Sequence, residues 1–301
     1  MSSDLINQMI MLFGIMAVGY VCNKVGVIDD VACARFSSFL IKVALPANII
    51  ASAFGNTNME AVTVLKVTGI AAGIFVMLPI FSKLVARVFH LDSTYQLMLN
   101  YSNLGFMGLP IIGSVFGTES IFYVSIFMMV FNIHIFTVGI MTLHGRAESL
   151  QSTLKKVCNP GVISALMAFV IVLMKLKAPQ PLVTVCGSLG SVTTPLAMTV
   201  IGAQLGQVDI RSILSKHQLY VMALFKLIVY PAVIFGILCL LFGGNAITEI
   251  ATILMGLPVA GNVTMLCSEY DGDTPLAAQG TCISTLFSVI TVPIMLTLIS
   301  H

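Results

Sequence analysis

The stretch that decides the fold is a repeat: residues 107–115 read MGLPIIGSV, and residues 255–263 read MGLPVAGNV. Six of the nine positions are identical, and the copies lie 148 residues apart, close to half of the 301-residue chain. Pro46 and Pro195 pair at nearly the same offset, which argues against coincidence. A repeat at this period predicts a chain made of two similar halves.

The composition around the repeat is that of a membrane protein. Apolar residues make up 58% of the chain and charged residues only 9%, and the mean hydropathy is +1.03. Lipid offers no hydrogen bonds to an exposed backbone, so apolar runs near 20 residues predict membrane-spanning helices. Ten spans are expected, at about residues 5–22, 36–54, 61–82, 94–117, 120–142, 160–176, 183–206, 218–242, 249–268 and 277–299.

The repeat pairs the fourth span with the ninth, so each half holds five spans. An odd number of spans makes the second half enter the membrane from the opposite face, which defines an inverted repeat. We therefore expect an all-α membrane protein with two inverted five-helix repeats, residues 1–150 and 151–301, that form one structural unit.

The distribution of basic residues predicts the orientation in the membrane. Nine Lys and Arg residues flank the loops that follow odd-numbered spans, whereas the opposite side has only Lys175 and Lys177. The positive-inside rule then places both termini outside and the loop at 144–159 in the cytoplasm, in a multi-pass protein of the cell (inner) membrane.

Glycine and proline in mid-membrane predict that spans four and nine are broken. Proline removes a backbone donor and glycine adds no stiffening side chain, so the two G-L-P stretches, Gly108 to Pro110 and Gly256 to Pro258, should free backbone groups, with Gly261 a further candidate for binding. Unwound backbone at this depth is tolerated only where it is buried or lines a cavity. The following half-helix N-termini carry positive dipole ends, which predicts a binding site for an anion.

Polar side chains near the breaks extend this predicted site. Asn103 and Asn262 can hold a carboxylate or a freed carbonyl, and Asn132 lies near the centre of span five. His134 is a candidate proton carrier, and Lys226 is a second coupling candidate. The alternative roles are hydrogen bonds between helices for the asparagines and histidine, and snorkelling of the lysine to the interface.

Several function classes are disfavoured by what the sequence lacks. All twelve Asp and Glu residues fall in loops or at span ends, so paired buried carboxylates of an ion antiporter are not expected. There is no H-E-x-x-H or G-x-S-x-G pattern, and no Cys/His metal spacing, so we expect neither an enzyme nor a bound metal or cofactor. The scattered basic residues do not favour nucleic-acid binding.

At these same residues the chain resembles the auxin efflux carrier family, which includes plant PIN carriers and bacterial carriers of dicarboxylates such as malate and malonate. The resemblance spans essentially the whole chain. The matching stretches are SNLGFMGLP at 102–110, Asn159-Pro160, Lys226 with Pro231, and 257–270.

This resemblance implies a scaffold of spans one, two, six and seven, and a mobile transport part of spans three to five and eight to ten. The fourth and ninth helices would cross at their breaks, with substrate bound there and carried by an elevator-like shift. The crossover asparagine falls on Asn103, and the crossover prolines fall on Pro110 and Pro258. An acidic residue that PIN carriers place in the third span is missing here. A homodimer through the scaffold helices is a further expectation.

The leading hypothesis is a secondary carrier of small organic anions, driven by membrane potential or a proton gradient. A sodium-coupled symporter related to the bile acid symporters is the alternative, because freed carbonyls can coordinate sodium. A non-transporting membrane receptor is a third possibility, and it would need a signalling or docking segment.

Overall fold

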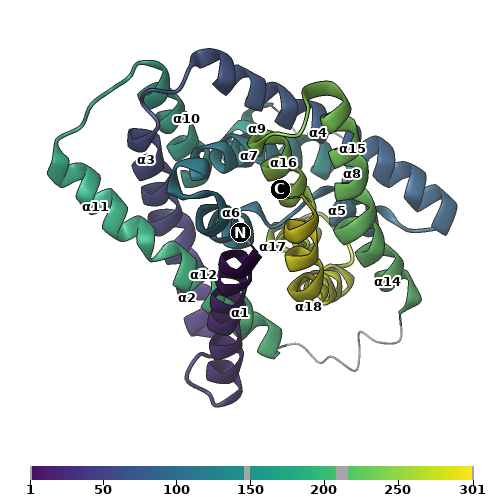
Figure 1. The fold of residues 1–301 in the computed structure, drawn as a ribbon. Coiled ribbons are helices and arrows are strands. Elements are labelled where there is room, and N and C mark those ends of the chain that lie inside the picture. Colours follow the sequence, from purple (N-terminus) through teal and green to yellow (C-terminus); the bar gives the residue numbers. More distant parts are fainter. Residues whose placement is uncertain (1, 146–149, 208–215, 300–301) are drawn as a thin grey trace. The chain divides into compact units, whose positions relative to one another are not determined.

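The computed structural model describes residues 2–145, 150–207 and 216–299, and within these ranges the chain is helical except for turns and one isolated backbone bridge (Figure 1). This confirms the all-helical class. The chain divides into two compact units, each assembled from three separate segments.

The first unit consists of Met1–Thr68, Leu104–Met129 and Cys158–Gln207. Within this unit the helices α1 and α12 pack closely against each other. A Cβ added to Gly202 of α12 would collide with the backbone carbonyl of Met16 in α1. Gly19 contacts the backbone of α12 in the same way, so small residues allow the two helices to approach. Its helices are α1 Ser2–Lys24, α2 Asp30–Phe39, α3 Leu45–Gly55, α6 Leu109–Phe116, α10 Pro160–Leu173, α11 Gln180–Ser191 and α12 Thr193–Gln207.

The second unit consists of Gly69–Asn103, Val130–Val157 and Val208–His301. It contains most of the long helix α4 and the end of α7. Its helices are α5 Ser93–Asn100, α8 Ile140–His144, α9 Leu150–Val157, α14 His217–Leu224, α15 Tyr230–Phe242, α16 Ala246–Met255, α17 Gly261–Glu269 and α18 Thr274–Ile299, with α4 Ala61–Phe89 and α7 Ile121–His134 running through both units.

Several helices begin where the sequence supplies a cap. The side chains of Asp29, Asp92, Asn159 and Asn245 each accept a hydrogen bond from a backbone N–H in the first turn of α2, α5, α10 and α16. Pro160 follows one of these caps at a position where its missing N–H has no helical partner to lose. Local chemistry therefore sets these helix starts.

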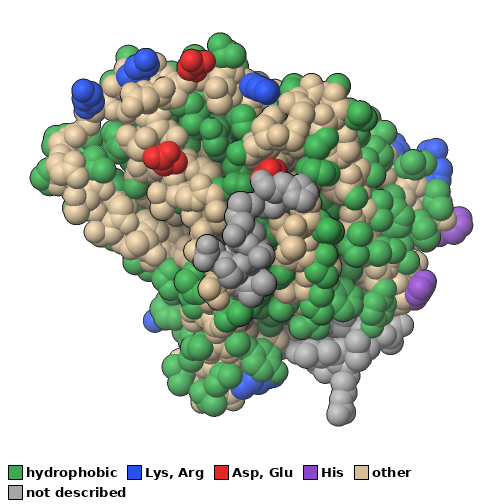
Figure 2. Space-filling model, viewed as in Figure 1, with side chains coloured by type: hydrophobic (Ala, Val, Ile, Leu, Met, Phe, Trp, Pro, Cys, Tyr) green, Lys and Arg blue, Asp and Glu red, His purple; other side chains and the backbone are tan. Residues whose placement is uncertain are grey.

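The described helices are apolar enough for a membrane. Six are long and hydrophobic enough to cross it, and a bent pair, Gln151–Val157 with Pro160–Leu173, makes a seventh. Large apolar side chains lie on the surface, such as Leu240 at 88% and Val62 at 71% exposure, and Figure 2 shows hydrophobic side chains covering much of the face in view. Such a surface fits lipid rather than water. The count of ten spans and their inverted relation stay predictions.

Three prolines are accommodated by wider, π-helical turns. Pro46, Pro110 and Pro231 each lie two residues after such a turn, formed by Leu40–Ala44, Leu104–Gly108 and Phe225–Val229. A π turn skips the regular hydrogen bond that proline cannot donate, so the helix continues without a break.

Two helix interruptions lie in spans four and nine, and one is not where the sequence predicted it. The second, at 256–260, contains Pro258 as expected. The first is formed by residues 101–103, whereas the predicted break at Gly108 to Pro110 is wrong, because that stretch is continuous helix. The π turn ahead of Pro110 absorbs the proline, and the break moves to a more polar stretch upstream.

Candidate functional site

The two helix breaks pair with each other inside the second unit. Ser102 and Val259 form an isolated antiparallel bridge. The Asn103 N–H donates to the Pro258 carbonyl at 2.8 Å, and the Ala260 N–H donates to the Tyr101 carbonyl at 3.0 Å. Each break thus satisfies backbone groups that the other would leave unpaired in a low-dielectric interior.

Two serine hydroxyls complete this pairing. Ser102 Oγ donates to the carbonyl of Met255 at 3.1 Å, where α16 ends. Ser284 Oγ, from the middle of α18, accepts from the Val259 N–H at 3.0 Å. Both serines are buried. The breaks are therefore fixed by side chains as well as by backbone, and α18 is part of their support.

Lys226 brings a positive charge to the first break. Its side chain is 1% exposed, and its ammonium donates to the Leu99 carbonyl at 3.0 Å and to Ser102 Oγ at 2.8 Å. These contacts use two of the three ammonium donors. Within the part of the chain that the structure describes, no carboxylate lies at ion-pair distance from Lys226. The snorkelling alternative is wrong for this lysine, because its ammonium points into the protein.

A tyrosine connects the first break to His134. Tyr101 is fully buried, and its hydroxyl lies 2.9 Å from His134 Nδ1 and 3.3 Å from the His134 carbonyl. When Nδ1 carries no proton, the hydroxyl can donate to it; when Nδ1 is protonated, the ring donates and the hydroxyl can turn to the carbonyl. Phe75 and Phe131 pack against the pair. The protonation of His134 is thereby linked to the backbone of the break.

The start of α17 lies directly after the second break. Its N-cap residue, Ala260, makes no side-chain capping bond. A Cβ built on Gly261 would meet no described atom within 4 Å, and Gly261 is exposed. This nine-residue helix therefore begins with an open side at Gly261 and carries a positive dipole end there.

The structure brings some of the predicted site residues together. Asn103 and Pro258 meet through a backbone hydrogen bond, and Lys226 and His134 reach the same break through Ser102 and Tyr101. The other candidates lie elsewhere in the described helices: Gly261 and Asn262 open α17, Asn132 is buried on α7, and Gly108 and Pro110 lie buried in the first unit. Their roles in binding stay predictions.

The sequence analysis did not single out Tyr101, Ser102 or Ser284 as site residues. Tyr101 and Ser102 had a usable signal, because with Asn103 they form a run of polar side chains inside an apolar span. Ser284 had no such signal in the sequence, since α18 carries several other buried Ser and Thr residues. Only the hydrogen bond to Val259 distinguishes it.

Comparisons with known proteins cover nearly all of this chain. A family model described as membrane transport protein matches residues 4–296. A protein of Rhizobium meliloti (strain 1021) named "Putative malonate transporter" is 23% identical, over 95% of this chain and 93% of its own length. A protein of Methanothermobacter thermautotrophicus named "Uncharacterized transporter" is 24% identical, over 93% of each chain.

Proposed function

Because this chain belongs to the membrane transport protein family, we propose that it is a secondary active carrier of small organic anions such as carboxylates. The family match confirms the resemblance to the auxin efflux carriers and makes the chain a multi-pass membrane transporter. The substrate, the driving force and the movement are the proposal.

The observation that carries the proposal is the buried charge of Lys226 at the paired breaks. A buried ammonium costs several kcal/mol unless its charge is compensated. Its described partners, the Leu99 carbonyl and the Ser102 hydroxyl, are neutral dipoles. An anionic substrate would supply the missing negative charge, and it would take up the third ammonium donor.

The open start of α17 supports the same substrate chemistry. With no side-chain cap, this helix start and its positive dipole end favour a carboxylate. Two separate positive features therefore lie around the second unit's breaks, which suits a molecule with two carboxylates. The relative named as a malonate transporter supports a small dicarboxylate as the first substrate to test.

The proposed movement is the elevator-type exchange of a transport part relative to a scaffold. In this proposal the ten spans form two inverted halves, residues 1–150 and 151–301, and the broken helices cross at the binding site. The division into two units supports part of it, because the first unit takes in the predicted spans one, two, six and seven and the second takes in spans eight to ten. Spans three, four and five are divided between the units, and Leu104–Met129 belongs to the first. The orientation with both termini outside and a homodimer through the scaffold helices belong to the same proposal.

Energy coupling is proposed to use the membrane potential or protons rather than sodium. His134 lies at hydrogen-bond distance from the first break through Tyr101, so a proton there would change the contacts of the break. Sodium coupling is the second candidate, since freed carbonyls can bind sodium. The Lys226 ammonium bound to the Leu99 carbonyl counts against it, because a second cation there would be repelled.

Uptake into proteoliposomes tests this function. We expect saturable uptake of labelled malonate, competition by unlabelled dicarboxylates, and little competition by amines of the same size. Potential, pH and sodium gradients should be imposed one at a time, because each isolates one coupling ion. Failure of every carboxylate to move under any gradient would overturn the proposed substrate class, and uptake only with sodium would favour the alternative.

A further inference from the structure

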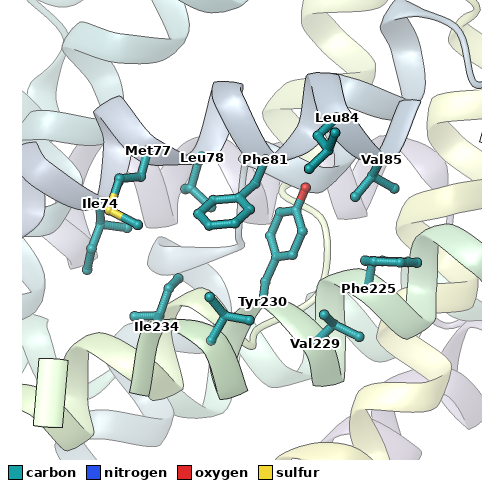
Figure 3. A pocket seen from close by; sticks show the side chains of 11 residues that line it. Ile74, Met77, Leu78, Phe81, Leu84, Val85, Phe225, Val229, Tyr230 and Ile234 are labelled. Carbon is teal, nitrogen blue, oxygen red and sulfur yellow. The ribbon is translucent and has the colours of Figure 1, made fainter. Parts of the chain in front are cut away.

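One π-helical turn of the second unit has no proline to accommodate. Among the helices that the structure describes, three π turns each end two residues before a proline: Leu40–Ala44, Leu104–Gly108 and Phe225–Val229. In the last of these, Phe225 and Val229 line an apolar groove beside α4 (Figure 3). The turn Ile135–Gly139, between α7 and α8, is followed by Met141 where the others have proline. Since π turns are rare and frequently occur at functional sites, its presence needs another reason.

This π turn aligns Gly139 with His134 along the helix. Residues five apart lie about 140° from each other around an α-helix, whereas a π turn joins them by a hydrogen bond. The His134 carbonyl is reached here by two hydroxyls, that of Tyr101 at 3.3 Å and that of Thr137 at 3.2 Å. The turn thus places a residue without a side chain beside the carbonyl that Tyr101 contacts.

Gly139 leaves room for the Tyr101 hydroxyl. Gly139 is buried, and a Cβ built on it would lie 3.0 Å from the hydroxyl oxygen of Tyr101. At this distance the hydroxyl must shift by a few tenths of an ångström. The Tyr101 ring is fully buried and packs edge-on against Phe131, so its hydroxyl has little freedom to do so. A shift away from this helix would break the bond to the His134 carbonyl, which is already 3.3 Å long.

The same position contacts α17, the helix that follows the second break. The Cβ would also lie 3.3 Å from Leu266 Cδ2 and 3.3 Å from Ile135 Cγ1. Leu266 is fully buried on α17. These two contacts are with aliphatic side chains, which can rotate away, whereas the Tyr101 hydroxyl is at the end of a rigid ring. The hydroxyl is therefore the group that a side chain at position 139 would displace.

The surroundings of His134 make this hydroxyl the group that responds to its protonation. From α4, Phe75 packs on the imidazole with ring centroids 5.5 Å apart, and from α17, Leu266 adds an apolar contact beside Tyr101. Among the described residues, His134 makes no ion pair. The charged group of the same break, Lys226, is hydrogen-bonded elsewhere in it. A proton on the imidazole is thus felt first by Tyr101.

We propose that Gly139 is a positioning residue for the Tyr101–His134 pair, and that the π turn serves to place it there. The inference rests on the proton coupling proposed above. The unprotonated ring accepts from the hydroxyl, while the protonated ring donates to it and the hydroxyl donates to the carbonyl. Both arrangements need the hydroxyl within reach of ring and carbonyl together. A side chain at position 139 removes the second arrangement, so protonation no longer changes the contacts of the first break.

Alanine at position 139 tests the proton response. In proteoliposomes we expect Gly139→Ala to lower malonate uptake about 5-fold, as the loss of one hydrogen bond would. It should also abolish the response of uptake to a pH gradient at fixed potential. Gly113→Ala is the matched control, because its Cβ would lie 3.1 Å from Ile121 and crowd a side chain to a similar degree without displacing a hydroxyl. This control should keep the response, and a normal response in Gly139→Ala would overturn the proposal.

Removal of the hydroxyl should rescue the alanine variant. Because the Cβ meets the hydroxyl oxygen, Tyr101→Phe makes room for it. In the Tyr101→Phe chain we expect Gly139→Ala to change uptake by about 2-fold or less, and to lower the thermal unfolding temperature in detergent less than it does in the natural chain. Equal losses of stability in both backgrounds would refute the positioning role. A natural chain without any response to a pH gradient would instead refute the proton coupling, and the stability comparison would still decide whether Gly139 positions the hydroxyl.

Discussion

In the second copy of the repeat Pro258 lies inside a helix break, whereas in the first copy Pro110 lies in continuous helix. The difference follows from what the paired breaks require of each residue. Pro258 only accepts a hydrogen bond, which a proline can do, while Asn103 opposite must donate its N–H. A proline in the first break at that position would lose the bond. A shared motif thus produces two structures: the π turn ahead of Pro110 keeps the first copy helical, whereas the Pro258 carbonyl in the second copy accepts the hydrogen bond of Asn103.

The comparison also separates the side chains that support the two breaks. The first break contacts a buried cation, Lys226, and a tyrosine-linked histidine, His134. The second is supported by the hydroxyl of Ser284 and is followed by the open start of α17. The first break therefore contacts the two ionisable side chains, and the second is supported by a neutral hydroxyl.

Loss of the charge at the first break should have the largest effect. We expect Lys226→Met to lower carboxylate uptake by about 100-fold, because a charge-assisted hydrogen bond contributes roughly 2–3 kcal/mol. Lys42→Met is the matched control, since Lys42 also lies in a π turn ahead of a proline but is exposed. Uptake into proteoliposomes with equal amounts of inserted protein measures both. Similar rates for the two variants would remove Lys226 from the site.

Loss of the neutral support at the second break should affect stability. Ser284→Ala leaves the Val259 N–H buried without its partner, which we expect to lower the free energy of unfolding by roughly 2 kcal/mol. Ser191→Ala, on an exposed face of α11, should change it by about 0.5 kcal/mol or less. Thermal unfolding in detergent compares them. If Ser284→Ala is as stable as the control, α18 does not support the break.

Replacing each of the two prolines with alanine tests whether the two copies of the motif differ in importance. Pro258→Ala adds an N–H and backbone freedom inside a break, and we expect uptake to fall about 10-fold, the equivalent of roughly 1.4 kcal/mol. Pro110 lies in continuous helix, so Pro110→Ala should change the uptake rate about 3-fold or less. Hydrogen exchange of residues 101–108 and 256–260 reports which break loosens. If Pro110→Ala lowered uptake more than Pro258→Ala, the helical first copy of the motif would matter more for transport than the broken second copy.

The tyrosine hydroxyl at the first break should have the smallest effect on rate. Tyr101→Phe keeps the ring against Phe131 and removes the hydrogen bond to His134, so we expect uptake to fall about 5-fold, as for roughly 1 kcal/mol. The more telling readout is the response to a pH gradient at fixed potential, which Tyr101→Phe and His134→Gln should both reduce. An unchanged response in both variants would exclude this pair from proton coupling.

Much of the chain was predictable because the signals are local. Apolar runs, caps such as Asn159 before Pro160, and the glycine and proline of the repeat lie within a few residues of the structure that they specify. The break at Pro258 follows from such a signal. The first break was misplaced because the π turn that absorbs Pro110, and the partner that stabilises residues 101–103, are not visible in local sequence.

The sequence by itself determined that this protein is a helical membrane protein with a repeated motif, a break at Pro258, and few buried ionisable groups, of which Lys226 and His134 were candidates. Only the tertiary structure decided where the first break lies and what surrounds it. The bonds that decide this join distant residues: Ser102 to Met255, 153 positions away, and Lys226 to Leu99, 127 positions away. In an interior without water, an unwound segment is stable only where the rest of the fold offers it partners, and a local pattern cannot name them.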